Sequence, residues 1–228
     1  MITFIHGDNQ GQSRSRLSEL IEESRNKEIV RLRDISLTSV KQALESSSLF
    51  TEERVVVLEN LLASRGTKDI WEYLKKGNYS CDLILWEGKK IDARKLGWVK
   101  KVGKVEEFSY PKTLFSFLES VGVVGTKQIL LLFNETVSQV PVELLYFMIV
   151  RQFRIMLLVA NNAQDTNIKE TARLQSWMLG KIKSQISAIG KKRISTLNKQ
   201  LLYIDYQQKS GQSTLNLRQT LDIWLAQV

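Results

Sequence analysis

The chain has 228 residues, of which 43% are hydrophobic and 25% are charged, so it is long enough to bury a core as one large domain or two small ones. It contains no run of about 18 apolar residues, which excludes an apolar membrane-spanning helix. One cysteine, Cys81, excludes an internal disulfide, and one histidine, His6, excludes a zinc site built from cysteine and histidine. We therefore expect a soluble cytoplasmic protein that holds no metal or cofactor and has no membrane partner.

Basic residues outnumber acidic residues by 33 to 24, for a formal net charge of +9. The excess is concentrated in the second half of the chain. Residues 1–110 carry 19 Lys and Arg against 17 Asp and Glu, whereas residues 111–228 carry 14 against 7. A positive surplus of this kind is compatible with a polyanionic partner such as nucleic acid, but it does not identify one by itself.

The first half of the chain contains short apolar runs, rich in β-branched residues, over residues 2–5, 28–32, 54–58, 82–86 and 104–108. Runs without polar alternation are typical of strands that are covered on both faces. The intervals between them are long enough for crossover helices, and apolar stripes such as Leu17, Leu20 and Ile21 supply these helices. The pattern predicts a parallel five-stranded sheet, with His6 as a buried or half-buried residue at the end of its first strand. A catalytic base is the alternative role for this histidine.

After residue 108 the apolar spacing becomes helical, and the Ser-Tyr-Pro stretch at 109–111 marks the change because proline disfavours helix at the residue before it. A continuous stripe runs from Val142 to Ala160, and shorter stripes follow over 194–204 and 217–224, the last with Ser213 as its expected N-cap. Residues 111–228 are therefore predicted to form an all-helical bundle. The tryptophans are expected to be packing anchors rather than a stacking platform: Trp71, Trp86, Trp98, Trp177 and Trp224.

The loop after the first predicted strand, Gly7 to Arg14, lies where open α/β sheets bind phosphate. A nucleotide-hydrolysing loop would carry the pattern Gly-x-x-x-x-Gly-Lys-Ser/Thr, and this loop has no lysine. The third strand ends in a lone carboxylate, Glu59, instead of the Asp-Glu pair that would hold magnesium and activate water, and Asp8 adds repulsion toward a triphosphate. We expect a scaffold without nucleotide hydrolysis. The alternative is a hydrolase with an atypical phosphate loop.

Four stretches carry a further signal: Phe-Ile-His-Gly-Asp-Asn at 4–9, Ser-Ser-Leu-Phe-Thr-Glu-Glu-Arg-Val-Val-Val-Leu at 47–58, Trp-Glu-Gly-Lys-Lys-Ile-Asp at 86–92 with Gly-Lys-Val-Glu-Glu-Phe at 103–108, and Leu-Leu-Tyr-Ile-Asp at 201–205 with Lys-Ser-Gly at 209–211. In content, order and spacing these stretches resemble the delta subunit of the bacterial DNA polymerase III clamp loader. The resemblance implies an AAA+-type parallel sheet domain without a functional P-loop, a small helical lid and a helical collar.

The fold class that follows is α/β plus all-α. On the basis of the resemblance we assign residues 1–108 to an AAA+-like clamp-binding domain, residues 109–123 to a linker or lid remnant, and residues 124–228 to a collar-like oligomerisation domain. Family members are longer than this chain by about the size of the lid. We therefore expect a shortened member in which most of the lid is missing.

The resemblance also implies a function, that of a non-hydrolysing clamp-loader subunit that binds the sliding clamp and holds it open for loading onto primed DNA during replication. Such a subunit has no enzymatic activity of its own, belongs to a DNA-directed DNA polymerase holoenzyme, and meets other loader subunits through its helical domain. The clamp contact of the family is a Leu-Phe pair before the third strand, which matches Leu49 and Phe50, preceded by Ser48. Where some members have glutamine five residues before the phenylalanine, this chain has Glu45. Core packing beneath the third strand is the alternative role for the pair.

Two groups of basic residues are candidates for contacts with DNA phosphates. The candidates are Lys89, Lys90, Lys100 and Lys101 in the sheet domain, and Lys181, Lys183, Lys191, Lys192 and Arg193, with Lys199 nearby, on two successive helices. A solvated helix face is the alternative, because lysine and arginine are normally exposed. A basic DNA-binding module that no longer binds the clamp is therefore a rival function.

Overall fold

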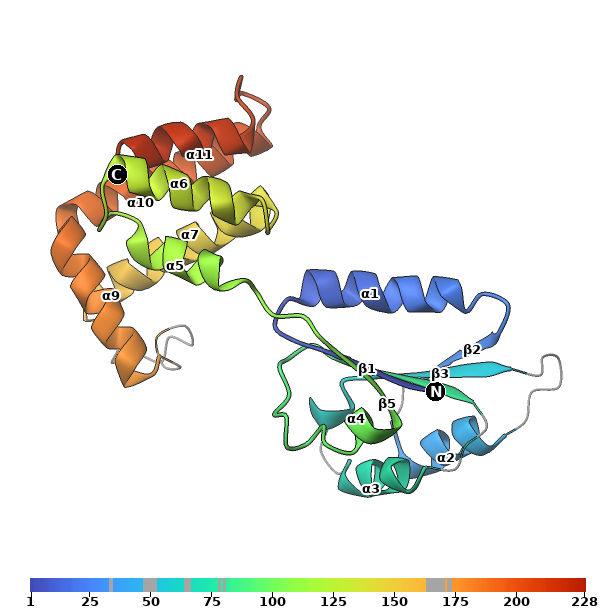
Figure 1. Ribbon diagram of the computed structural model, residues 1–228. Helices are drawn as coiled ribbons and strands as arrows, with labels where there is room; N and C mark the ends of the chain where they lie inside the picture. Colours follow the sequence, from blue (N-terminus) through green and yellow to red (C-terminus); the bar gives the residue numbers. More distant parts are fainter. Residues whose placement is uncertain are drawn as a thin grey trace. The chain divides into compact units, whose positions relative to one another are not determined.

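The computed structural model describes residues 1–32, 35–46, 53–63, 67–77, 79, 81–162, 171 and 174–228. It divides into two compact units, Met1–Tyr110 and Pro111–Val228. The first unit is built on a β-sheet, and the described part of the second consists of helices and their connections (Figure 1). Among the described residues, no helix is both long enough and apolar enough to cross a membrane.

The sheet unit contains five parallel strands, and each predicted apolar run becomes one of them. The strands are β1 (Ile2–His6), β2 (Glu28–Arg31), β3 (Arg54–Glu59), β4 (Asp82–Glu87) and β5 (Gly103–Glu107), in the order β2-β3-β4-β1-β5. Along β3, Val55 and Val57 belong to one core cluster, while Val56 and Leu58 belong to the other. Neither face of this strand meets water, which explains its uninterrupted apolar sequence. The predicted parallel five-stranded sheet is confirmed.

Helices cover both faces of the sheet (Figure 1). Helix α1 (Gln10–Glu23) lies on one face, where its Leu17 packs in a cluster with Ile5 and Trp86. The opposite face carries α2 (Leu37–Glu45), α3 (Lys68–Lys76) and α4 (Val99–Val102), and the short 3-10 helix η1 (Leu61–Ala63) adds Leu61 to the same core. The predicted burial of His6 is confirmed, since only 2% of this residue is exposed.

The helical unit contains α5 (Lys112–Ser120), α6 (Thr126–Val137), α7 (Val142–Ala160), α9 (Ser176–Ile189), α10 (Lys191–Lys209) and α11 (Leu217–Ala226). The long predicted stripe is the core face of α7, where Leu145, Ile149 and Phe153 have no exposed surface. Trp224 of α11 meets Phe153 edge to face, with the ring centroids 5.5 Å apart. For the described residues after 110, the predicted all-helical structure is confirmed.

Residues 112–120 lie in the span predicted as a linker or lid remnant, and they form α5. Gln185 of α9, which is 4% exposed, donates from Nε2 to the carbonyl oxygens of Leu118 at 2.9 Å and Val121 at 3.0 Å. Its Oε1 accepts a hydrogen bond from Gln152 of α7 at 2.9 Å. These contacts make α5 an integral part of the helical unit. The functional roles assigned to the three spans stay predictions.

Two local predictions in the helical unit are wrong. Trp177 is 59% exposed and is not a packing anchor. The N-cap of α11 is Asn216, whose Oδ1 accepts from the Gln219 amide at 2.9 Å, while the Gln219 side chain accepts from the Asn216 amide at 3.1 Å. This reciprocal capping box satisfies two amides at once. The hydroxyl of Ser213 instead donates to the carbonyl oxygen of Leu215.

Candidate functional site

The loops after β1 and β4 meet at the carboxyl end of the sheet. In open α/β sheets this edge holds the ligand at the point where the strand order reverses, and here the chain leaves β1 and β4 in opposite directions along the sheet. The amide of Gly7 donates to the carbonyl oxygen of Lys89 at 3.3 Å, and the side-chain Nε2 of Gln10 donates to the carbonyl oxygen of Gly88 at 3.0 Å. The crevice is therefore bridged by hydrogen bonds of the chain itself.

The amides of the β1 loop, which a phosphate group would require, are largely used within the chain. The Asn9 amide donates to the carbonyl oxygen of Phe108 at 3.0 Å, and the Asn9 side chain accepts from the Gln12 amide at 3.2 Å to cap α1. Gly7 has φ +140°, and a Cβ on it would lie 1.9 Å from the Phe108 carbonyl oxygen. Only glycine fits here. The loop is held against the end of β5 instead of being open to an anion.

The side chains that follow the loop are also paired. The hydroxyl of Ser13, a residue with no exposed surface, donates to the carbonyl oxygen of Gln10 and accepts from the Trp86 indole, both at 3.2 Å. The guanidinium of Arg14 lies 3.6 Å from the centroid of the Trp86 ring and forms an ion pair with Glu59. Glu59 is the lone carboxylate at the end of β3, and Arg14 neutralises it. This arrangement favours packing over magnesium binding.

Two further groups at this edge have structural partners. Nδ1 of His6 accepts from the Ile91 amide at 3.2 Å, and burial, with Lys90 and Lys100 nearby, lowers the pKa of the imidazole. Glu87 is 3% exposed, its pKa is raised by burial, and its Oε1 accepts from the Leu62 amide at 2.6 Å. Sequence reasoning missed Glu87, because it closes an apolar run without any motif of its own. In the described part of the chain, no cluster of three or more His, Cys, Asp and Glu side chains could hold a metal ion.

The predicted clamp-binding residues Ser48, Leu49 and Phe50 lie outside the described residues. The two ends of their loop are described, and Arg54 joins them. Arg54 stands at the start of β3 and donates from Nη1 to the carbonyl oxygen of Ser46 at 2.7 Å, directly after α2. Its Nε and Nη2 donate to a carboxylate oxygen of Glu28 on β2, at 3.0 and 2.9 Å. The loop therefore begins and ends at one fixed point of the sheet unit.

Glu45 faces α3. At this position some members of the resembled family have glutamine. Oε1 of Glu45 accepts from the Tyr73 hydroxyl at 2.7 Å. Burial and the hydrogen bond to Glu45 together raise the pKa of Tyr73 to about 12. The ammonium of Lys41 lies 5.4 Å from the centroid of the Tyr73 ring. Glu45 thus fixes the last turn of α2 on the sheet unit.

The basic candidates of the sheet unit are exposed. Lys89 and Lys90 follow β4, and Lys100 and Lys101 belong to α4. Lys90 pairs with Glu107 at 2.6 Å, which lowers the pKa of that carboxyl. The placement of the other three at the surface is compatible with phosphate contacts and with simple solvation.

Two basic candidates of the helical unit have structural partners. Lys181 of α9 pairs with both carboxylate oxygens of Glu119 on α5, at 2.6 and 2.8 Å. Arg193 of α10 donates to the carbonyl oxygens of Gln227 at 2.6 Å and Val228 at 3.3 Å, beyond the last turn of α11. Three further lysines are exposed at the surface of α9 and α10: Lys183, Lys191 and Lys192.

Comparison with known proteins bears on the helical unit most directly. Residues 112–223 match the family described as DNA polymerase III delta subunit, C-terminal domain. Among solved structures, the Bacillus subtilis DNA clamp loader delta protein (YqeN) is similar over 99% of this chain and 94% of its own, with 13% sequence identity and a TM-score of 0.46. No curated protein matches the chain. Residues 112–223, which make up most of the helical unit, are therefore similar to the C-terminal domain of the DNA polymerase III delta subunit family.

Proposed function

We propose that the chain is a non-hydrolysing clamp-loader subunit, which binds the sliding clamp and holds it open for loading onto primed DNA. The observation that carries the proposal is the family match of the helical unit, from residue 112 to residue 223. The helical unit would join the chain to the other loader subunits. The sheet unit would present the clamp-binding loop.

The anchoring of the loop supports clamp binding by Leu49 and Phe50. Because Arg54 bonds Ser46 at the other end of the loop, the separation of the loop ends does not have to be fixed anew on binding. Burying each apolar side chain contributes about 1.5 to 3 kcal/mol, whereas association costs on the order of 4 to 15 kcal/mol. The pair is therefore a hot spot that needs a surrounding interface.

Opening of the clamp follows from differential affinity. A ligand shifts an equilibrium between two states only by its difference in affinity for them. The loop would bind a surface of the clamp that fits the loop better when one interface of the ring is open than when the ring is closed. No chemical step is needed in this subunit, and the ATP used by a loader would act through other subunits.

The bridged carboxyl edge of the sheet supports the absence of nucleotide chemistry in this chain. Gly7 and Asn9 use their amides within the chain, Ser13 uses its hydroxyl, and Arg14 neutralises Glu59. A triphosphate would have to displace these partners and would also meet the charge of Asp8. Nucleotide hydrolysis by an atypical phosphate loop is therefore the less well supported hypothesis.

Primed DNA is the remaining partner in the proposal. The exposed lysines of α9 and α10 and the excess of basic residues in the second half of the chain support phosphate contacts. A module that binds DNA without engaging the clamp is the second candidate function, and it rests on the same lysines.

The experiment that tests the proposal is co-elution of the full chain with the sliding clamp of its own organism on a gel-filtration column. Leu49→Ala combined with Phe50→Ala should abolish co-elution and leave thermal unfolding nearly unchanged. The matched control is Leu131→Ala with Phe147→Ala, which alters the same residue types at helical positions that are 64% and 61% exposed. Clamp binding that survives the first pair, or a large loss of stability in that pair, would contradict the proposed contact.

A further inference from the structure

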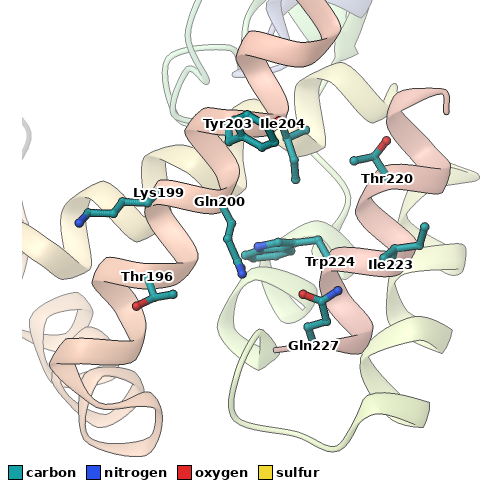
Figure 2. A pocket seen from close by; sticks show the side chains of 9 residues that line it. All are labelled: Thr196, Lys199, Gln200, Tyr203, Ile204, Thr220, Ile223, Trp224 and Gln227. Carbon is teal, nitrogen blue, oxygen red and sulfur yellow. The ribbon is translucent and has the colours of Figure 1, made fainter. Parts of the chain in front are cut away.

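A groove of about 430 Å³ lies between α10 and α11 of the helical unit (Figure 2). Its walls are mainly apolar. Ile204 and Trp224 are buried, whereas Tyr203 and Ile223 are 59% and 51% exposed at its rim. Exposed apolar residues beside a concave surface are typical of a binding site.

Two polar atoms in the groove lack hydrogen-bond partners. Oε1 of Gln200 and Nε1 of Trp224 are both buried, and no described residue pairs with either atom. Figure 2 shows that the two side chains extend from facing helices toward one another across the groove. One is an acceptor and the other a donor. Buried polar groups without partners are costly and rare, so each of them needs an explanation.

The neighbouring polar groups are satisfied, which sets this pair apart. The Tyr146 hydroxyl donates to the carbonyl oxygen of Leu201 at 2.6 Å, and Nε2 of Gln208 donates to the Ser213 hydroxyl at 3.0 Å. Within the described part of the helical unit, Gln200 and Trp224 hold the only two buried side-chain atoms of this kind without a partner. The unused bonding capacity is therefore concentrated in the groove.

We propose that this groove binds an extended acidic peptide segment of a partner protein. Each residue of such a segment offers one carbonyl oxygen and one amide hydrogen, which complement the Trp224 indole and the Gln200 carbonyl oxygen. An apolar side chain of the peptide fills the space between Tyr203 and Ile223. Lys199, which is exposed and lines the same groove, pairs with a carboxylate of the segment.

Charge complementarity favours an acidic segment. The second half of the chain carries 14 basic residues against 7 acidic ones, so acidic segments are attracted to it over several ångströms. Binding requires the terminal amide of Gln200 to turn toward the incoming peptide, a rotamer change of the kind common at interfaces. This inference does not depend on clamp binding, because it uses none of the residues of the clamp-binding loop.

The test uses the full chain and fluorophore-labelled blocked pentapeptides that carry one glutamate beside a central leucine, phenylalanine or tryptophan. We expect saturable binding of at least one of them, measured by fluorescence anisotropy. Trp224→Phe and Gln200→Met should each weaken it about fivefold or more, because each removes one hydrogen bond. Trp177→Phe, which alters an exposed tryptophan of α9, should leave it unchanged.

Methylation of the peptide nitrogen beside the central residue sharpens the test. It removes one amide hydrogen, so it should weaken binding to the unmodified chain but not to the Gln200→Met variant. Gln200→Met should unfold at the same temperature as the unmodified chain or higher, because it removes a polar group that has no partner in the free protein. Trp224→Phe should unfold at a somewhat lower temperature, because it shortens a buried side chain that packs against Phe153. Both variants should also keep clamp co-elution.

Three outcomes would overturn the inference. The first is the absence of saturable binding by any of the peptides at millimolar concentration. The second is unchanged affinity in Trp224→Phe, or a lowered unfolding temperature of Gln200→Met, which would mean that the Gln200 amide has a partner within the protein. The third is self-association that Ile223→Glu abolishes, which would assign the groove to a second copy of the chain.

Discussion

The carboxyl edge of the sheet unit and the groove of the helical unit use their polar groups in opposite ways. At the edge, Gly7, Asn9 and Ser13 donate their hydrogens to other groups of the chain. In the groove, a buried donor of Trp224 and a buried acceptor of Gln200 have no partner in the described part of the chain. A site whose donors are used has little left to offer a ligand, whereas unused capacity favours one. The comparison indicates that the carboxyl edge of the sheet serves as a scaffold, whereas the groove of the helical unit has bonding capacity left for a partner.

The largest expected effect comes from Gly7→Ala, which tests the closed state of the edge. The new Cβ would collide with the Phe108 carbonyl oxygen, at a φ that favours glycine. We expect the sheet unit to lose at least ~3 kcal/mol of unfolding free energy. Urea denaturation followed by tryptophan fluorescence measures this loss. Gly125→Ala is the control, since no heavy atom lies within 4 Å of its Cβ position, and an equal loss there would contradict the argument.

Arg54→Met tests the anchoring of the loop that we propose to bind the clamp. The side chain of Arg54 is 11% exposed and joins the ends of α2, β2 and β3, so its removal should cost about 2 kcal/mol. Clamp affinity should fall as well, because a looser loop loses more entropy on binding. Arg94→Met removes an ion pair in which the arginine side chain is 92% exposed and should change neither quantity. Full clamp affinity in Arg54→Met would show that anchoring is irrelevant.

Arg193→Gln and Lys192→Gln separate structural from DNA-binding roles among neighbouring basic residues. Arg193 bonds carbonyl oxygens at the end of the chain, so Arg193→Gln should destabilise the helical unit by about 1 kcal/mol. The exposed Lys192 should contribute no stability. If it contacts a phosphate, Lys192→Gln should reduce the slope of log affinity against log salt by about 1. An unchanged slope would remove Lys192 from the proposed DNA surface.

The smallest effect is the pH dependence due to His6. Burial lowers its pKa in the folded state, so the unfolded chain binds the proton more readily, and stability rises with pH between the folded and unfolded pKa values. The contribution of His6 is present above about pH 6.5, the unfolded pKa, and is lost as the pH falls below it. His6→Gln should flatten this part of the stability curve, measured by urea denaturation between pH 5 and 7.5. A curve of unchanged slope would contradict the lowered pKa.

The elements that could be predicted are those in which local pattern and tertiary burial agree. The apolar run of β3 is buried on both faces, and the stripe of α7 packs as its spacing indicates. The N-cap of α11 was misplaced because Ser213 and Asn216 are both good caps, and the reciprocal bonds with Gln219 decide between them. Exposure of Trp177 was missed because the spacing of apolar residues does not show which tryptophans other helices cover.

The chemistry of the candidate sites was only partly predictable. The missing lysine and the lone Glu59 indicate the loss of a nucleotide site. The sequence does not show that Arg14 pairs with Glu59, because the two residues are 45 positions apart. The bond from Gln10 to Gly88 spans 78 positions. Whether the polar atoms of Gln200 and Trp224 find hydrogen-bond partners depends on how α10 and α11 face each other. Sequence spacing shows which residues share a helix face, but not which polar atoms find partners.

The central claim is that this chain opens the clamp by binding alone, and the most direct measurement is energy transfer between two dyes placed across one interface of the sliding clamp. Adding the full chain without nucleotide should lower the transfer as the interface opens, and ATP should not change the result. The Leu49→Ala and Phe50→Ala variant should leave the transfer high at every concentration. Binding of the unmodified chain with no fall in transfer, or a fall that requires ATP, would contradict the account.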